Sequence, residues 1–109
     1  MMDGNNKFKL EFLEDVKNKD IPKLDGSQLV FVKKGLKRIQ QFGMSCGQPL
    51  YGELEGYRKL KNRKMGLRIV FGQNHKTQEI NIIDIVAIGK REKLEVYKIA
   101  QERIKKHPK

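Results

Sequence analysis

A run near the C-terminal end of the chain, Ile80 to Ile88, is apolar on both faces except at Asn81 and Asp84. Successive side chains of a strand point to opposite faces, so a strand with this composition is buried on both sides. It belongs inside a sheet that helices cover on one side at least. A chain of 109 residues supports one modest core. We therefore expect a single domain over residues 1–109, with residues 1–6 flexible.

Upstream of this run, the hydrophobic period predicts a strand and two helices. Phe8 to Phe12 alternates apolar with polar residues, the pattern of a half-buried strand. Helical spacing begins at Leu13, but Pro22 interrupts it, so the first helix is short or restarts there. A second helix follows the turn Asp25–Ser27 and ends at Gly43. Its apolar face consists of Leu29, Val32, Leu36, Ile39 and Phe42.

The second half of the chain predicts three strands and a last helix. Residues 43–56 are rich in turn formers and make a connecting loop. Strands follow near 57–63, 67–71 and 80–88, with a turn at Gly72–Lys76. An amphipathic helix starts at about Glu92 and ends in a basic tail, Arg103 to Lys109. The order β-α-α-β-β-β-α predicts an α+β fold with a mainly antiparallel sheet.

The charge of the chain is uneven and favours a polyanionic partner. Residues 26–109 carry nineteen basic and seven acidic side chains, a net charge of +12. No apolar run approaches the about 18–20 residues that a membrane span needs. The single cysteine, Cys46, has no partner for an intrachain disulfide, which fits a reducing compartment. We expect a soluble, cytoplasmic protein with no membrane association.

Several kinds of site have no support in the sequence. His75 and His107 are isolated from other metal-ligand residues. No Ser-His-Asp arrangement, glycine-rich phosphate loop or pair of carboxylates stands out. We expect no metal and no cofactor. The sequence also offers few residues suited to ordinary acid–base hydrolysis.

The segment Tyr57 to Arg68 contains six Lys or Arg residues and no acid. Strand alternation places Lys59, Lys61 and Arg63 on one face. One interpretation is a solvated basic face. The other is a phosphate site, because arginine binds phosphate with two parallel hydrogen bonds, and a lysine among other cations has a lowered pKa that suits a general base.

Arg91 and Tyr97 extend the second interpretation. On one helix they would lie about 120° apart around the axis, so they converge only if Arg91 lies at the junction between strand and helix. Tyr97 is either a core aromatic with its hydroxyl at the rim, or a ring that stacks on an unpaired RNA base.

Three motifs resemble one known family. They are Gly-Lys-Arg-Glu-x-x-Glu-Val-Tyr at 89–97, Lys-Leu-Lys-x-Arg at 59–63 and Gly-x-Arg-Ile-Val-Phe at 66–71. Together with the loop from Pro49 to Tyr57, they resemble the RelE group of the RelE/ParE toxin superfamily, the toxins of type II toxin–antitoxin pairs. The resemblance implies a sheet packed against an N-terminal helical hairpin and a C-terminal helix. It also implies a ribosome-dependent endoribonuclease that cuts mRNA in the ribosomal A site and has a cognate antitoxin as its partner.

The resemblance also implies roles for individual residues. Lys59 and Lys61 match the strand lysines, with Lys61 as general base, and Arg68 matches the arginine that stabilises the transition state. Arg91 matches the arginine that serves the leaving oxygen, and Tyr97 the tyrosine that stacks on the mRNA base. Further RNA contacts are expected from Arg58, Arg63, Lys64 and Lys90. Attack by the ribose 2′-OH would leave a cyclic phosphate and a 5′-OH.

Two alternatives stay open at the level of sequence. A ParE-like toxin would share the fold and the antitoxin partner but would inhibit DNA gyrase without cutting RNA. A basic RNA-binding accessory protein without activity would explain the charge but would leave Arg91 and Tyr97 without a role.

Overall fold

The computed structural model describes residues 7–74, 76, 79 and 81–106. Predictions for residues 1–6, His75, Ile80 and residues 107–109 lie outside the described residues. In the described chain a five-stranded sheet has the order β1-β5-β4-β3-β2. The strands are β1 (Lys9–Phe12), β2 (Gln48–Pro49), β3 (Tyr57–Asn62), β4 (Leu67–Gln73) and β5 (Ile82–Lys90). The two α-helices are α1 (Gly26–Phe42) and α2 (Glu95–Lys106).

The predicted α+β fold with a mainly antiparallel sheet is confirmed. β2, β3, β4 and β5 pair antiparallel in sequence, whereas β1 lies parallel to β5 and pairs Lys9 to Phe12 with Ile82 to Ile85. β5 is an interior strand, as its apolar composition predicts, with β1 on one side and β4 on the other. A parallel neighbour requires a long connection, and here residues 13–81 connect the two strands.

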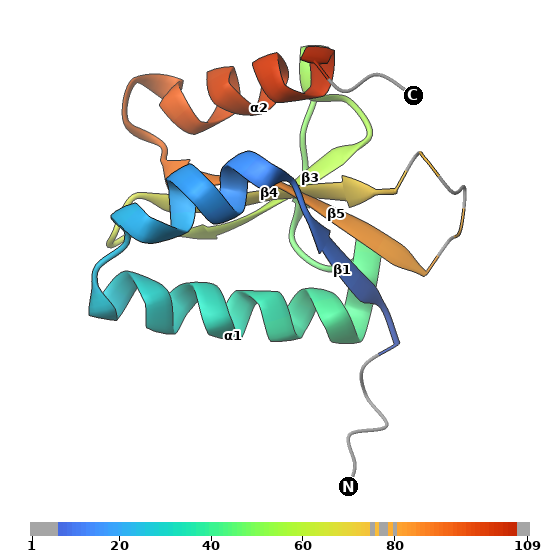
Figure 1. Ribbon diagram of the computed structural model, residues 1–109, viewed down its shortest axis with the longest axis horizontal. Coiled ribbons are helices and arrows are strands. Elements are labelled where there is room, and N and C mark those ends of the chain that lie inside the picture. The colour runs from blue at the N-terminus through green and yellow to red at the C-terminus, as the bar shows by residue number, and fades with distance from the viewer. Residues whose placement is uncertain (1–6, 75, 77–78, 80, 107–109) are drawn as a thin grey trace, which may run out of the picture.

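The two helices cover opposite faces of the sheet (Figure 1). On the α1 face, Val32 and Ile39 of the helix join Ile69 and Phe71 of β4, which are fully buried. On the α2 face, buried Val96 and Ala100 join a second set that contains Val70, Val86 and Ala87. Because both faces are covered, β5 is apolar on both sides.

The ends of α1 follow from local sequence. Asp25 accepts a hydrogen bond from the Gln28 backbone at 2.8 Å, and the Gln28 side chain accepts one from Asp25 N–H at 2.9 Å, which forms a capping box. Gly43 ends the helix with φ +57°, a conformation that glycine adopts readily. Gly35 inside the helix is buried, and a Cβ there would lie 2.9 Å from Ile69 Cδ1. The close approach of helix and sheet therefore explains this glycine.

Three details differ from the sequence prediction. The first helical segment consists of a π-helical turn (Val16–Asp20) and a 3₁₀ turn (Ile21–Lys23), so the expected restart lies at Pro22. The loop 43–56 contains the short edge strand β2, whose Pro49 lacks a backbone donor and suits an edge. Gly72 belongs to β4 rather than to a turn, and the ring of Tyr57, its partner on β3, covers it.

Arg103 is the clearest correction in this part of the chain. The sequence places it in a basic tail, but α2 continues through it to Lys106 and buries it to 6% exposure. Its guanidinium pairs with the buried carboxylate of Asp20 at 2.7 Å. A partner so distant along the chain gives no periodic signal in the sequence.

Candidate functional site

A hollow of about 600 Å³ lies on the face of the sheet at the ends of β3 and β4. We call it the basic hollow. It is lined by Lys59, Lys61, Arg63, Gly66, Arg68, Arg91 and Glu92. Five of these residues are cations, and Glu92 is the single acid among them. The structure thus brings together five of the positions that the sequence singles out.

Strand pairing and one loop contact assemble the hollow. Lys61 lies directly opposite Arg68 in the antiparallel pair of β3 and β4. The backbone N–H of Arg91 donates to Gly66 C=O at 2.7 Å, which ties the segment after β5 to the turn between β3 and β4. Arg91 therefore lies at the junction between β5 and α2, whereas Tyr97 is not among the described residues that line the hollow.

The other cations of the hollow lower the pKa of Lys61. The positive charge of Arg63 is the largest cause that lowers the pKa of Lys61, followed by partial desolvation and the charges of the other cations of the hollow. The uncharged amine is consequently more populated near neutral pH than in an isolated lysine. The direction of this shift is the one that a general base requires.

Arg68 and Tyr97 carry the two buried polar side-chain atoms that lack a hydrogen-bond partner in the described part of the chain, Arg68 Nε and Tyr97 Oη. Arg68 is 5% exposed, and its Nη1 donates to Leu67 C=O at 2.9 Å. The half-buried ring of Tyr97 has Lys59 Nζ 5.6 Å from its centroid, within the range of a cation–π contact. The Tyr97 hydroxyl is not at the rim, as one interpretation expected, but buried. Unpaired buried polar atoms are uncommon, and here both belong to residues of the candidate site.

Three predicted RNA-contact residues lie apart from the basic hollow. Arg58 donates from Nε to Cys46 C=O at 2.8 Å and from Nη2 to Gly47 C=O at 2.7 Å, so its guanidinium holds the loop before β2. Lys64 is exposed in the turn between β3 and β4. Lys90 lines a different hollow.

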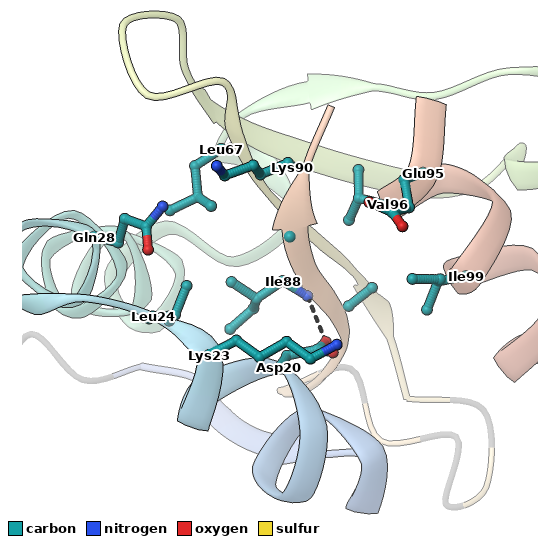
Figure 2. A pocket seen from close by; sticks show the side chains of 12 residues that line it. Asp20, Lys23, Leu24, Gln28, Leu67, Ile88, Lys90, Glu95, Val96 and Ile99 are labelled. Carbon is teal, nitrogen blue, oxygen red and sulfur yellow. Dashed lines mark hydrogen bonds between the residues drawn. The ribbon is translucent and has the colours of Figure 1, made fainter. Parts of the chain in front are cut away.

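That second hollow, of about 210 Å³, lies between the 3₁₀ turn, the end of β5 and the start of α2 (Figure 2). Its wall includes Leu24, Ile88 and Val96, and Lys90 and Gln28 lie beside it in Figure 2. Its lining mixes apolar side chains with charged ones of both signs, among them Asp20, Lys90 and Glu95, whereas the basic hollow is lined mainly by cations.

Sequence reasoning missed the place of Glu92, which was expected only to support the start of the helix. Lys93 and Leu94, the next residues, have φ of 54° and 59°. Non-glycine residues in this region are strained, and such strain clusters at functional sites. The left-handed pair delays the start of α2, so Glu92 faces the basic hollow instead of continuing a regular helix. No motif signals this conformation.

Comparison with known proteins decides the fold family. No family model matches the sequence, and no curated protein is significantly similar to it. Among solved structures, a double arginine-to-alanine variant of E. coli toxin RelE in the free state superposes with a TM-score of 0.71 and 27% identity, covering 90% of this chain and 98% of that one. The chain has the RelE fold. The resemblance to the RelE group of toxins is thus confirmed.

Two further RelE-fold structures are complexes. The same E. coli RelE variant bound to an antitoxin RelBc peptide has a TM-score of 0.62 and 25% identity, covering 86% of this chain and 94% of that one. The M. tuberculosis toxin–antitoxin complex RelBE2 has a TM-score of 0.62 and 19% identity, covering 78% and 99%, which shows the fold alone.

Two structural features are absent from the described residues of this RelE-fold chain. These residues contain no helix that is long and apolar enough to span a membrane. They also contain no group of three or more His, Cys, Asp or Glu side chains that could hold a metal ion.

Proposed function

We propose that this chain is the toxin of a toxin–antitoxin pair and that it cleaves mRNA on the ribosome. The observation that carries the proposal is the basic hollow, in which four other cations surround a lysine whose pKa they lower. A phosphodiester is the substrate that such a hollow fits, because its charge increases in the transition state. The RelE fold supports the same class of activity.

In the proposed reaction, Lys61 accepts the proton of the ribose 2′-OH. The 2′ oxygen then bonds to the adjacent phosphorus while the bond from phosphorus to the 5′ oxygen breaks, which yields a cyclic phosphate and a 5′-OH. Arg68 and Lys59 offset the charge on the phosphate oxygens. Arg91 hydrogen-bonds the leaving oxygen without losing its own proton, since an arginine stays charged, and water supplies the proton for the 5′-OH.

The residues of the basic hollow support the proposed dependence on the ribosome. Among the described residues, the lining of the hollow holds a single carboxylate, Glu92, and no histidine, so these residues provide no acid–base pair of the usual kind. Orientation of the mRNA by a ribosome would supply much of the missing rate, because correct positioning lowers a barrier by several kcal/mol. We then expect the half-buried ring of Tyr97 to stack on a base of the held mRNA.

The proposed partner in the resting cell is an antitoxin, and the proposed location is the cytoplasm, where ribosomes and antitoxin meet. Two of the solved neighbours are complexes with antitoxin. An acidic or amphipathic segment would complement the charge of +12 over residues 26–109 and would order on binding.

Primer extension on an mRNA, with and without ribosomes, tests the proposal. We expect cleavage only on the ribosome, lost in Lys61→Met and kept in Lys34→Met, which changes an exposed lysine of α1 outside the hollow. Efficient cleavage of free RNA would contradict ribosome dependence. Inhibition of DNA gyrase without any RNA product would favour a ParE-like toxin instead.

A further inference from the structure

Arg103 and Asp20 form a buried, two-pronged ion pair between α2 and the π-helical turn. Arg103 Nη1 and Nη2 donate to the two carboxylate oxygens of Asp20 at 2.7 and 2.9 Å. The side chains are 7% and 8% exposed. Asp15 adds a longer contact, 3.7 Å from Arg103 Nε. Two parallel hydrogen bonds fix direction as well as distance.

The pair also takes the place of a missing neighbour of β5. β1 ends at Phe12, opposite Ile85, whereas β5 continues to Lys90. Beyond this point Ile88 N–H donates to Asp20 Oδ2 at 2.8 Å, the bond drawn in Figure 2. Val86 C=O accepts from Arg103 Nη1 at 3.0 Å. Buried backbone groups need partners, and the ion pair supplies both, so Arg103 has one defined place on β5.

The position of α2 on the sheet depends on such contacts. The link from β5 to α2 passes through the left-handed residues Lys93 and Leu94, so the helix does not extend the strand in a straight line. The apolar contacts of α2 come from buried Val96 and Ala100 and from partly buried side chains that include Ile99 and Ile104, and hydrophobic contact has no preferred direction. A directional contact is therefore needed to choose one position of α2.

A buried ion pair adds little stability compared with apolar residues of similar volume, and its best-attested use is to select one arrangement. Tyr97 lies six residues before Arg103 on the same helix, about 9 Å along its axis. Displacement at Arg103 would move the Tyr97 ring relative to Lys59, its neighbour at 5.6 Å.

We propose that Asp20 and Arg103 are positioning residues of the basic hollow, which hold α2 so that the Tyr97 ring stays against Lys59. The inference rests on the proposed function for its kinetic test, but its structural content does not.

A double-mutant cycle provides the kinetic test. Arg103→Met is made in the parent and in Tyr97→Ala, and single-turnover cleavage is measured at saturating ribosomes. We expect a fall of about tenfold or more in the parent and of less than about twofold in Tyr97→Ala, because residues that act through one another are not additive. Ribosome affinity should stay unchanged, and Arg103→Lys should restore part of the rate. An equal loss in both backgrounds would overturn the inference.

Nuclear magnetic resonance of the Tyr97 ring provides the second test, which needs no activity. Arg103→Met and Asp20→Asn should shift the ring resonances and speed the exchange of the Ile88 amide proton, whereas the exposed control Lys105→Met on the same helix should do neither. Asp20→Asn keeps the shape of the side chain and serves if Arg103→Met does not fold. Faster exchange at Ile88 with unmoved Tyr97 resonances would overturn the inference. Absence of cleavage in the parent would overturn the proposed function, while these resonances still decide the positioning role.

Discussion

Lys61 on β3 faces Arg68 on β4 as its direct partner across the antiparallel pair. Opposed like charges destabilise a sheet, and the position is nevertheless built with a buried Arg68, 5% exposed, whose Nη1 is held by the Leu67 carbonyl. The pairing of Lys61 with Arg68 is therefore expected to lower the free energy of unfolding. The pairing places a lysine with a lowered pKa beside a guanidinium that a backbone carbonyl holds. This combination suits the proposed cleavage of a phosphodiester.

Replacing Arg91 by Ala should lower the single-turnover cleavage rate by about 10²-fold or more, as loss of one transition-state donor does. Ribosome affinity should change little, because one phosphate contact is a small part of the electrostatic total. Neutralising the exposed Lys105 and Lys106 on α2 should do the reverse, weakening binding and its salt dependence. Rates are measured with ribosomes in excess. A parent-like rate for Arg91→Ala under these conditions would remove Arg91 from the mechanism.

The pH dependence of cleavage should identify the base. The cleavage rate should rise with pH as Lys61 loses its proton, and should level off at a lower pH than the pKa of an ordinary lysine would give, because the pKa of Lys61 is lowered. Since the charge of Arg63 is the largest cause of that shift, Arg63→Gln should move the rise to higher pH. Lys64→Gln, the neighbour outside the hollow, serves as the control. Identical profiles for the parent and Arg63→Gln would argue against Lys61 as the base.

Substitution of Tyr97 by Phe should separate the ring from the hydroxyl. The hydroxyl is buried without a partner in the described residues, so Phe should keep or raise the free energy of unfolding, by up to about 1 kcal/mol. Cleavage should persist, because the stacking ring remains. Tyr97→Ala should lose both the packing and the rate. Urea denaturation and cleavage of the two variants check this, and a large loss of activity in Tyr97→Phe would assign the hydroxyl a chemical role.

Gly35 and Gly26 offer a matched pair in α1. Alanine at Gly35 gains helix propensity, but its Cβ would lie 2.9 Å from Ile69 Cδ1 and 3.3 Å from Leu60 Cδ1. Overpacking typically costs about 1–3 kcal/mol, so Gly35→Ala should lower the free energy of unfolding. A Cβ at Gly26 has nothing within 4 Å, so Gly26→Ala should raise stability by up to about 1 kcal/mol. Thermal unfolding measures both, and a more stable Gly35→Ala would show that the helix can move away from the sheet.

Sequence periodicity was sufficient to predict the helices and strands in which buried side chains recur at a regular spacing. The apolar run that forms β5, the alternation of β1 and the spacing of α1 all report a local period. Strand alternation also placed Lys59 and Lys61 on one face. Contacts between distant segments were not predictable in this way. The Arg103–Asp20 pair joins positions 83 residues apart, so a basic C-terminal stretch appeared to be a tail.

Two other positions could not be predicted from the sequence because they depend on the local conformation of the folded chain. Arg58 has the same composition signal as its neighbours on β3, but its guanidinium binds the loop carbonyls of Cys46 and Gly47. Glu92 faces the basic hollow because Lys93 and Leu94 adopt positive φ, which neither residue type favours. These positions depend on backbone geometry that the completed fold imposes.

The parallel pairing of β1 with β5 also has a consequence during synthesis. Lys9 lies opposite Ile82, so the first strand emerges from the ribosome long before its partner has been translated. Arg91 and Tyr97 follow β5 and emerge later still. The basic hollow therefore cannot be completed on a nascent chain until Arg91 and Glu92 have emerged, because these two residues line it and non-local strand pairing must wait for both segments. Under the proposed function, the toxin would thus stay inactive until its own β5 and the start of its α2 have left the ribosome.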